Sequence, residues 1–185
     1  RDWSSDVCSS DLTLRNAPAL FNLAWKKDFM RDGAVNHLEV QALAPIENPD
    51  EMGEKFSVIV EKIKRRELYR KLFEDAFKKA PDGAGILKAL SAFELTLVSK
   101  ASRYDSVMLG KAVFTHQEER GYLLFRKHCN SCHTEPLFTK NGFEKNGMPL
   151  DTAIKDYGRM RVTGRREDSL LFSIPSLRNL KFTAQ

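Results

Sequence analysis

The sequence has no long apolar run, no internal repeat and no low-complexity tract. A membrane-spanning helix needs about 18–20 consecutive apolar residues, so we expect no membrane span in this chain. Most basic residues lie near acidic ones, as in 61–67 (Glu-Lys-Ile-Lys-Arg-Arg-Glu), and the formal net charge is only +5. This pattern is typical of a solvated helix face and not of a surface that binds nucleic acid, so we expect no nucleic-acid partner.

Cysteine is scarce: the chain contains Cys8, Cys129 and Cys132. Residues 1–12 read RDWSSDVCSSDL, with no apolar period, no hydrophobic stretch and no small-residue cleavage site, so they are not a signal peptide. The string is similar to a translated sequencing adapter. We predict that residues 1–12 are a non-native artefact, which leaves two cysteines in the natural chain.

The two remaining cysteines belong to the pattern Cys129-Asn130-Ser131-Cys132-His133. C-x-x-C-H is the attachment signature of c-type haem. Thiols three positions apart reach the two vinyl groups on one porphyrin edge, and the adjoining imidazole lies beneath the ring and binds iron. We therefore predict that Cys129 and Cys132 bind haem c covalently and that His133 is the iron ligand.

Zinc and disulfide-exchange sites also use paired cysteines. A structural zinc site needs two further ligands at close spacing, and only His37, His116 and His128 remain. A thioredoxin-like pair needs a surrounding βαβ pattern, which the sequence does not show. Gly121 and Phe125 lie one turn apart in the helix expected before the motif. This arrangement resembles the first helix of class I cytochromes c and favours haem.

The chain is expected to be mainly α-helical. Apolar residues recur at helical spacing in three segments, which begin near Asp50, Leu68 and Gly85. The segment 44–49 contains two prolines and is predicted not to be helical.

The second half of the chain is organised around one strong helix signal. Thr115 and Glu118 form the ends of a capping box, which predicts a helix through Lys127. Residues 102–111 are predicted to be a polar connector, and we place a domain boundary at Gly110. The part beyond the haem motif is expected to be loop with short helical turns.

Several separated blocks, in their order and spacing, resemble the dihaem bacterial cytochrome c peroxidases, a family that includes the methylamine-utilisation dihaem enzymes. The resemblance covers nearly all of residues 13–185. Besides the haem motif, the blocks are Arg-Asn-Ala-Pro (15–18), Phe-Met-Arg-Asp-Gly (29–33), Leu-Glu-Val-Gln-Ala (38–42), Ala-Pro-Ile-Glu-Asn-Pro-Asp-Glu-Met (44–52), Arg-Gly-Tyr-Leu-Leu-Phe (120–125), Glu-Pro-Leu-Phe-Thr (135–139) and Pro-Ser-Leu-Arg-Asn (175–179).

The resemblance implies a mainly α fold with two cytochrome-c-like haem domains, both incomplete in this chain. Residues 13–110 would be the C-terminal part of the peroxidatic haem domain, whose own haem motif lies upstream. Residues 111–185 would be the N-terminal part of the electron-transfer domain. The haem at Cys129, Cys132 and His133 would then receive electrons from a donor protein.

The resemblance also assigns roles to side chains. Gln41 and Glu51 match a polar pair on the distal side of the peroxidatic haem, where a carboxylate can move a proton between peroxide oxygens. Asn16 and Thr183 match a side-chain and a backbone ligand of a Ca²⁺ ion, a cation that prefers oxygen ligands. Arg178 is a candidate partner for a haem propionate.

Other positions depart from the family pattern or leave it incomplete. Arg31 stands where many relatives have a tryptophan that can relay electrons, and Gln185 stands where the family has proline. Met148 and Met160 follow the motif, but we interpret both as loop or packing residues. The distal ligand of the second haem is expected beyond Gln185.

The favoured function is that of a periplasmic peroxidase, which reduces hydrogen peroxide with electrons from a small donor protein, either a cytochrome c or a cupredoxin. A homodimer is compatible with this function. Three alternatives stay open: an electron-transfer cytochrome without peroxidase activity, a methylamine-utilisation-type dihaem oxidase, and a calcium- or zinc-stabilised binding module without redox function. The fragment alone is expected to be inactive because it lacks the peroxidatic haem motif.

The full reading frame tests this assignment. We predict that it encodes a signal peptide and a second C-x-x-C-H upstream of residue 13, because attachment of haem c takes place on the periplasmic side. Sequencing the intact gene checks both features. An upstream region without a second haem motif would rule out the peroxidase assignment.

Overall fold

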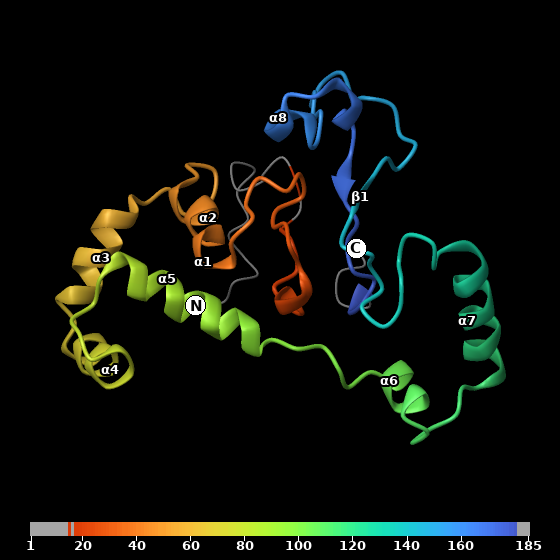
Figure 1. Cartoon of the computed structure of the whole chain (residues 1–185), viewed down its shortest axis with the longest axis horizontal. Coiled ribbons are helices and arrows are strands. Elements are labelled where there is room, and N and C mark those ends of the chain that lie inside the picture. Colours follow the sequence, from red (N-terminus) through yellow and green to blue (C-terminus); the bar gives the residue numbers. More distant parts are fainter. Residues whose placement is uncertain (1–14, 16, 181–185) are drawn as a thin grey trace, which may run out of the picture. The chain divides into compact units, whose positions relative to one another are not determined.

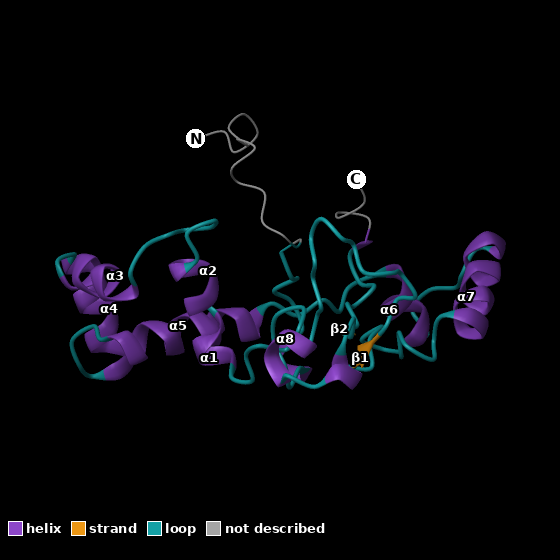
Figure 2. Cartoon of the chain, turned by 90° about the horizontal axis from the view of Figure 1, so that it is seen from above, coloured by secondary structure: helices purple, strands orange, loops and turns teal. Residues whose placement is uncertain are grey.

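The computed structural model describes residue 15 and residues 17–180. These residues form mostly helices and loops, with a single two-stranded sheet (Figures 1 and 2). No helix in the described ranges is long and apolar enough to cross a membrane. Internal contacts divide the chain into two compact units. Of the described residues, we call 15, 17 and 35–94 the helical unit, and 18–34 with 95–180 the motif unit.

The helical unit is a set of short helices: α1 (Leu38–Gln41), α2 (Leu43–Glu47), α3 (Phe56–Lys64), α4 (Glu67–Phe77) and most of α5 (Gly83–Thr96). The start of α5 packs tightly on α4, since a Cβ built on Gly85 would lie 2.8 Å from the ring of Phe73. Phe73 is buried and its ring lies 5.2 Å from that of Phe77. The backbone N–H of Gly85 donates to the Asp82 carboxylate at 2.7 Å, which fixes the beginning of α5.

The prediction that residues 44–49 are not helical is wrong, because α2 includes Pro45. Pro45 lies in the first turn of α2, where a backbone N–H has no intrahelical partner to lose. The helix expected to begin near Asp50 begins instead at Phe56. Residues 48–54 fold back on α2, and the N–H of Met52 donates to the carbonyl of Pro45 at 3.1 Å.

Only part of the apolar periodicity in the helical unit corresponds to buried side chains. Phe73 and Leu87 are buried, but Leu68, Leu72 and Phe93 are 51–66% exposed. The helical periodicity of these positions is correct, since they lie on α4 and α5. A unit of five short helices has too little internal surface to cover both sides of each helix.

The motif unit contains η2 (Leu23–Trp25), α6 (Arg103–Met108), α7 (His116–His128), β1 (Phe143–Glu144), α8 (Met160–Thr163), η3 (Arg166–Asp168) and β2 (Phe172–Ser173). β1 and β2 are antiparallel, with Phe143 opposite Ser173. The long loops between these elements agree with the expectation of loop and short turns beyond the haem motif.

Residues 18–34 are bound to this unit by hydrogen bonds from distant parts of the chain. The N–H of Ser173 donates to the carbonyl of Arg31 at 2.7 Å, and the side-chain amide of Asn141 donates to the carbonyl of Trp25 at 2.8 Å. In Figure 1 this segment, at the red end of the colour scale, runs beside the blue strand β2. The anchoring of residues 18–34 therefore depends on contacts more than 100 positions away in sequence.

The compact units do not coincide with the expected boundary at Gly110. The division falls after Glu94, and residues 18–34 belong with the C-terminal unit. The connector 102–111 contains α6, which begins with a capping box between Ser102 and Asp105. How the two haem domains of the intact protein divide the chain stays a prediction.

Candidate haem site

The motif follows directly on α7. A capping box begins α7: the Glu118 carboxylate accepts from the N–H of Thr115 at 2.8 Å, and the Thr115 hydroxyl accepts from the N–H of Glu118. Its last turn carries Arg126, Lys127 and His128, which suit the negative end of the helix dipole. The predicted helix is confirmed, and it ends on Cys129 as the C-cap.

The motif itself is a tight turn. The N–H groups of Cys132 and His133 both donate to the carbonyl of Cys129, at 3.1 and 2.9 Å. This turn places Cys129, Cys132 and His133 within a single turn of backbone. Both cysteines are free and half-buried, so neither thiol is used in a disulfide. Two available thiols in this order fit the attachment of haem c.

The imidazole of His133 is held by two backbone carbonyls. Its Nδ1 lies 3.2 Å from the oxygen of Phe138 and 3.1 Å from that of Pro175. A carbonyl oxygen only accepts, so Nδ1 carries the proton and Nε2 keeps its lone pair. This is the tautomer that a metal-ligating histidine uses, with its other nitrogen fixed by a hydrogen bond.

Both carbonyls are themselves held in place. The Thr139 hydroxyl donates to the oxygen of Ile174 at 2.8 Å, and the Ser176 hydroxyl donates to that of Leu137 at 2.6 Å. These bonds join the segment after the motif to the segment after β2. They also surround Phe138, whose ring packs on Phe125 of α7 at 5.1 Å.

Glu135, two residues after His133, accepts hydrogen bonds from two tyrosine hydroxyls. Tyr104 of α6 and Tyr122 of α7 donate to the same Oε1 at 2.7 and 2.8 Å. Burial, and then the hydrogen bond to Glu135, raise the pKa of Tyr104 above its usual range. Both phenols therefore stay protonated and can donate, which ties α6 and α7 to the segment after the motif.

Arg178 forms a bidentate ion pair with Asp105. Its Nη1 and Nη2 donate to the two carboxylate oxygens at 2.9 and 2.6 Å, while Nε donates to the carbonyl of Pro136. The Arg178 side chain is 6% exposed, and this guanidinium holds the pKa of Asp105 well below its usual range. The role of Arg178 as a partner of a haem propionate stays a prediction. A propionate would have to share the guanidinium with Asp105, which already binds it.

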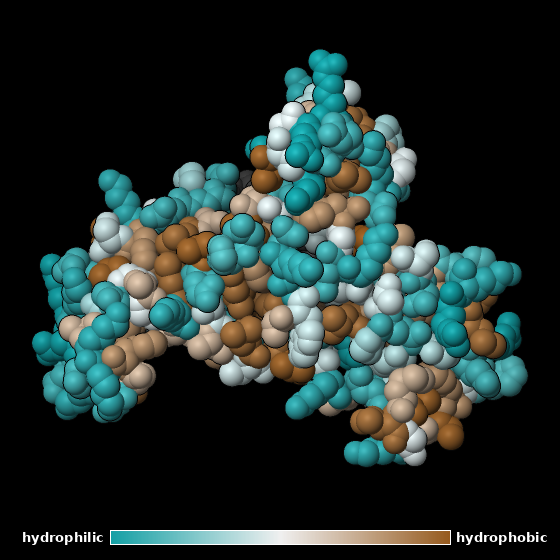
Figure 3. Space-filling model, in the orientation of Figure 1, coloured by the Kyte–Doolittle hydropathy of each residue, from teal (hydrophilic) through white to brown (hydrophobic). Residues whose placement is uncertain are grey.

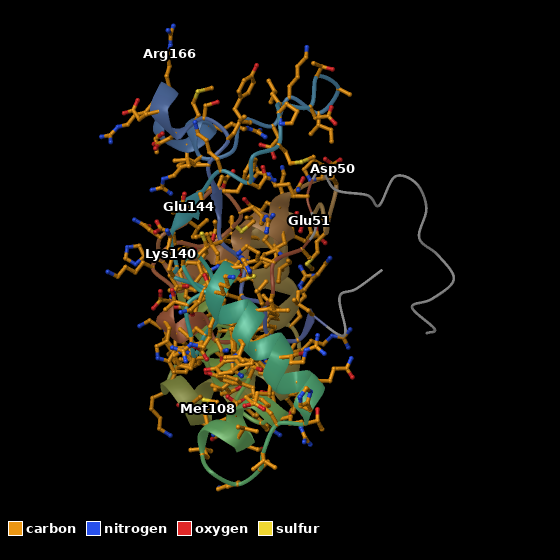
Figure 4. All side chains as sticks on the ribbon, turned by 90° about the vertical axis from the view of Figure 1, so that its right-hand side faces the viewer. Asp50, Glu51, Met108, Lys140, Glu144 and Arg166 are labelled. Atoms are coloured by element: carbon orange, nitrogen blue, oxygen red, sulfur yellow. The ribbon has the colours of Figure 1, made fainter. Side chains whose placement is uncertain are left out.

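The helical unit holds the predicted peroxide-handling pair. Gln41 ends α1 and is buried. Glu51 lies on the turn after α2, exposed, and its Oε1 accepts from the side-chain amide of Asn48 at 2.9 Å. Figure 4 labels Glu51 beside Asp50 on this turn. Nine residues, which include α2, separate Gln41 and Glu51 in sequence.

The remaining predicted positions are divided between described and undescribed parts of the chain. Asn16, Thr183 and Gln185 lie outside the described residues, so the calcium ligands stay predictions. Arg31 belongs to the motif unit and is half-buried. Met148 is 66% exposed in a loop, as interpreted from the sequence. A Cβ on Gly121 would meet no described atom within 4 Å, so the close helix approach inferred there is not seen in the described part.

Three parts of the site were not found from the sequence. The Ser102–Asp105 capping box has the spacing that marks a helix start and could have been recognised. The pairing of Asp105 with Arg178 spans 73 positions, and that of Tyr104 with Glu135 spans 31, so no local pattern indicates either. Among the described residues, no group of three or more His, Cys, Asp or Glu side chains is arranged to hold a metal ion.

Comparison with known proteins places the chain in a family. The family model for di-haem cytochrome c peroxidase matches residues 3–113, so the chain belongs to this family. The matched range includes residues 3–12, whose foreign origin stays a prediction.

Curated relatives include both enzyme types. The chain is 36% identical to the methylamine utilization protein MauG of Methylorubrum extorquens, covering 90% of this chain and 48% of the relative. It is 32% identical to the cytochrome c551 peroxidase of Nitrosomonas europaea, covering 91% and 52%. The chain thus spans about half the length of these relatives.

Solved structures agree on the fold. A MauG-like protein associated with microbial copper homeostasis superposes with a TM-score of 0.84 at 30% identity, covering 93% of this chain and 57% of the other. The dihaem peroxidase BthA from Burkholderia thailandensis superposes with a TM-score of 0.75 at 24% identity, covering 91% and 52%. The mainly helical fold expected from the sequence is confirmed.

The haem site predicts that covalently bound haem is lost when its two attachment cysteines are removed. Replacing both Cys129 and Cys132 by serine removes both thioethers, so no haem stays with the polypeptide in denaturing electrophoresis. Haem staining and the pyridine haemochrome spectrum measure this. Cys8→Ser is the matched control and is expected to keep the full haem content. A c-type spectrum that survives the double substitution would contradict the assignment.

The Asp105–Arg178 pair predicts a pH-dependent stability. Asp105 has a depressed pKa in the folded chain, so its contribution is present above the unfolded pKa of about 4 and is lost as pH falls through the folded pKa. Asp105→Asn leaves Arg178 without its buried partner and is expected to cost about 3–5 kcal/mol at pH 7. The difference from wild type is expected to shrink below about pH 4.

Urea unfolding at pH 7 and pH 3 measures both values. The control is Glu144→Gln, which breaks the exposed pair with Lys140 that is labelled in Figure 4. This change is expected to cost no more than about 1 kcal/mol. Equal losses of unfolding free energy in Asp105→Asn and Glu144→Gln would show that burial of Arg178 does not strengthen its ion pair with Asp105.

Proposed function

We propose that the intact protein is a periplasmic dihaem cytochrome c peroxidase. It reduces hydrogen peroxide to two waters, using two protons and two electrons from a small donor protein, a cytochrome c or a cupredoxin. The observation that carries the proposal is the haem site, in which two free thiols and a correctly protonated His133 follow α7. Membership of the di-haem peroxidase family supports the reaction.

In this proposal the two haems have separate tasks. Residues 13–110 belong to the peroxidatic domain, and residues 111–185 belong to the electron-transfer domain. When bound, haem supplies the redox chemistry, and the chain supplies ligation, orientation and proton transfer. A Ca²⁺ ion held by the Asn16 side chain and the Thr183 carbonyl would be bound by oxygen atoms, as that cation requires. Attachment of haem c on the periplasmic side supports the proposed location.

Glu51 is the proposed acid–base and Gln41 the proposed orienting group. Cleavage of the O–O bond needs a proton moved from one peroxide oxygen to the other, and a carboxylate that is free to accept and return a proton can do this. The Asn48 amide orients the Glu51 carboxylate, while its exposure leaves it open to solvent protons. The buried Gln41 has a fixed position, which suits a group that orients a small ligand.

The methylamine-utilisation type is the second candidate. The relative with 36% identity bears that name, and the MauG-like structure covers 93% of this chain. Steady consumption of peroxide with a reduced cytochrome c or cupredoxin favours the peroxidase. Failure of every such donor, with peroxide still oxidising the protein, favours the second type.

Substitution at Glu51 tests the catalytic assignment in the full-length protein. Glu51→Gln is expected to lower kcat for peroxide about 10²–10⁴-fold, the usual contribution of a positioned acid–base group. The haem content is expected to be unchanged. Steady-state assays with a reduced donor measure the effect, and Asp50→Asn, on the same turn, is the matched control. Equal activity in Glu51→Gln and wild type would contradict the role of Glu51.

A further inference from the structure

The segment after the haem motif is bound to the segment after β2 through a buried hydroxyl. Thr139 is 8% exposed and directly follows Phe138, one of the two residues whose carbonyls hold the imidazole. Its hydroxyl donates to the carbonyl of Ile174, directly before Pro175, at 2.8 Å. The same hydroxyl accepts from the backbone N–H of Asn141 at 3.1 Å. Because one lone pair is used in this way, the hydroxyl proton is directed to the opposite segment.

Ser176 makes the reciprocal bond. It directly follows Pro175, and its hydroxyl donates to the carbonyl of Leu137, directly before Phe138, at 2.6 Å. It also accepts from the backbone N–H of Arg178 at 3.2 Å. We call the two hydroxyl–carbonyl bonds of Thr139 and Ser176 the hydroxyl clamp. Each carbonyl that binds the imidazole therefore lies between one residue that donates across the clamp and one that accepts.

The imidazole proton is shared between the two carbonyls that the clamp holds. Nδ1 of His133 lies 3.2 Å from the oxygen of Phe138 and 3.1 Å from that of Pro175, so one N–H has two acceptors at nearly equal distance. The Phe138 oxygen also accepts from the backbone N–H of Leu177 at 3.2 Å. Hydrogen bonds weaken steeply with distance and angle, so a small displacement of either segment changes how strongly Nδ1–H is bound.

The backbone of Phe138 is held in an unusual conformation. Its φ of 56° lies in the left-handed region, which residues with a side chain seldom adopt. Such conformations persist only where the surrounding contacts maintain them, and they occur often at functional sites. The rings of Tyr104 and Phe125 lie 4.8 and 5.1 Å from the Phe138 ring. These rings and the hydroxyl clamp together maintain the backbone that places the Phe138 carbonyl at the imidazole.

We propose that Thr139 and Ser176 are positioning residues that set the reduction potential of the haem held by His133. A hydrogen bond from Nδ1 makes the imidazole a stronger electron donor, which favours the oxidised iron and lowers the reduction potential. The clamp keeps both acceptors in place and therefore keeps the potential low. The inference rests on iron ligation by His133 and does not rest on the roles of Gln41 and Glu51.

Removal of either hydroxyl tests the proposal in the full-length, haem-loaded protein. Thr139→Val and Ser176→Ala each release one side of the clamp and are expected to raise the reduction potential. At the ambient potential that half-reduces the wild-type haem, the ratio of reduced to oxidised haem is expected to rise about threefold or more. Optical potentiometric titration measures this ratio. Thr139→Ser and Ser176→Thr keep the hydroxyl and are expected to keep the wild-type potential.

Thr163→Val is the matched control. The Thr163 hydroxyl donates to the Asp168 carboxylate at 2.6 Å, the same length as the Ser176 bond, and it too is half-buried. Its loss is expected to lower stability and to leave the potential unchanged. A shift in Thr163→Val as large as in the clamp variants, or wild-type potentials in both clamp variants, would overturn the proposal.

Exchange of the imidazole proton gives a second readout that needs no substitution. In the reduced wild-type protein with ¹⁵N-labelled histidine, the Nδ1 proton of His133 is expected to give a resolved NMR signal, while that of the exposed His128 is lost by exchange with solvent. Absence of the His133 signal would overturn the proposal even where a clamp variant fails to fold. A wild-type protein without a c-type haemochrome spectrum would overturn the haem site and this proposal together, whereas a c-type spectrum with unmoved potentials would overturn this proposal alone.

Discussion

The hydrogen bonds from His133 Nδ1 to the carbonyls of Phe138 and Pro175 are the constraint on which the site depends. An imidazole next to two cysteines can rotate and can carry its proton on either nitrogen. The two carbonyls remove both freedoms, because they accept hydrogen bonds from the protonated Nδ1 and leave Nε2 for a metal. Much of the surrounding loop structure keeps these two carbonyls in place.

The elements that support the carbonyls come from distant parts of the chain. Hydrogen bonds of Thr139 and Ser176 join the two loops that carry the carbonyls. Glu135 fastens the first loop to α6 and α7 through two tyrosine hydroxyls. Arg178 fastens the second loop to α6 through Asp105 and to the first loop through the Pro136 carbonyl. The orientation of one imidazole in a five-residue motif therefore depends on contacts from across the described part of the motif unit.

The exposed apolar residues of the described part fit a chain that spans half of its relatives. Met108, Leu109 and Val113, around and after α6, are 48–79% exposed, and Figure 3 shows apolar side chains at the surface there. Leu123 and Leu124 of α7 are each 59% exposed beside the haem motif. Scattered exposed apolar residues are ordinary, but clusters of them favour burial against another surface.

The sequence by itself determined the haem motif and the helix that precedes it. Both are local: thiol spacing defines the attachment chemistry, and a capping box at Thr115 begins α7. The tertiary structure decided what local patterns do not contain. It placed Pro45 within a helix, grouped residues 18–34 with the C-terminal unit, and paired Arg178 with Asp105. It also brought the hydroxyls of Thr139 and Ser176 to carbonyls 35 and 39 positions away. Such pairings depend on the path of the chain in space, and spacing along the sequence does not record that path.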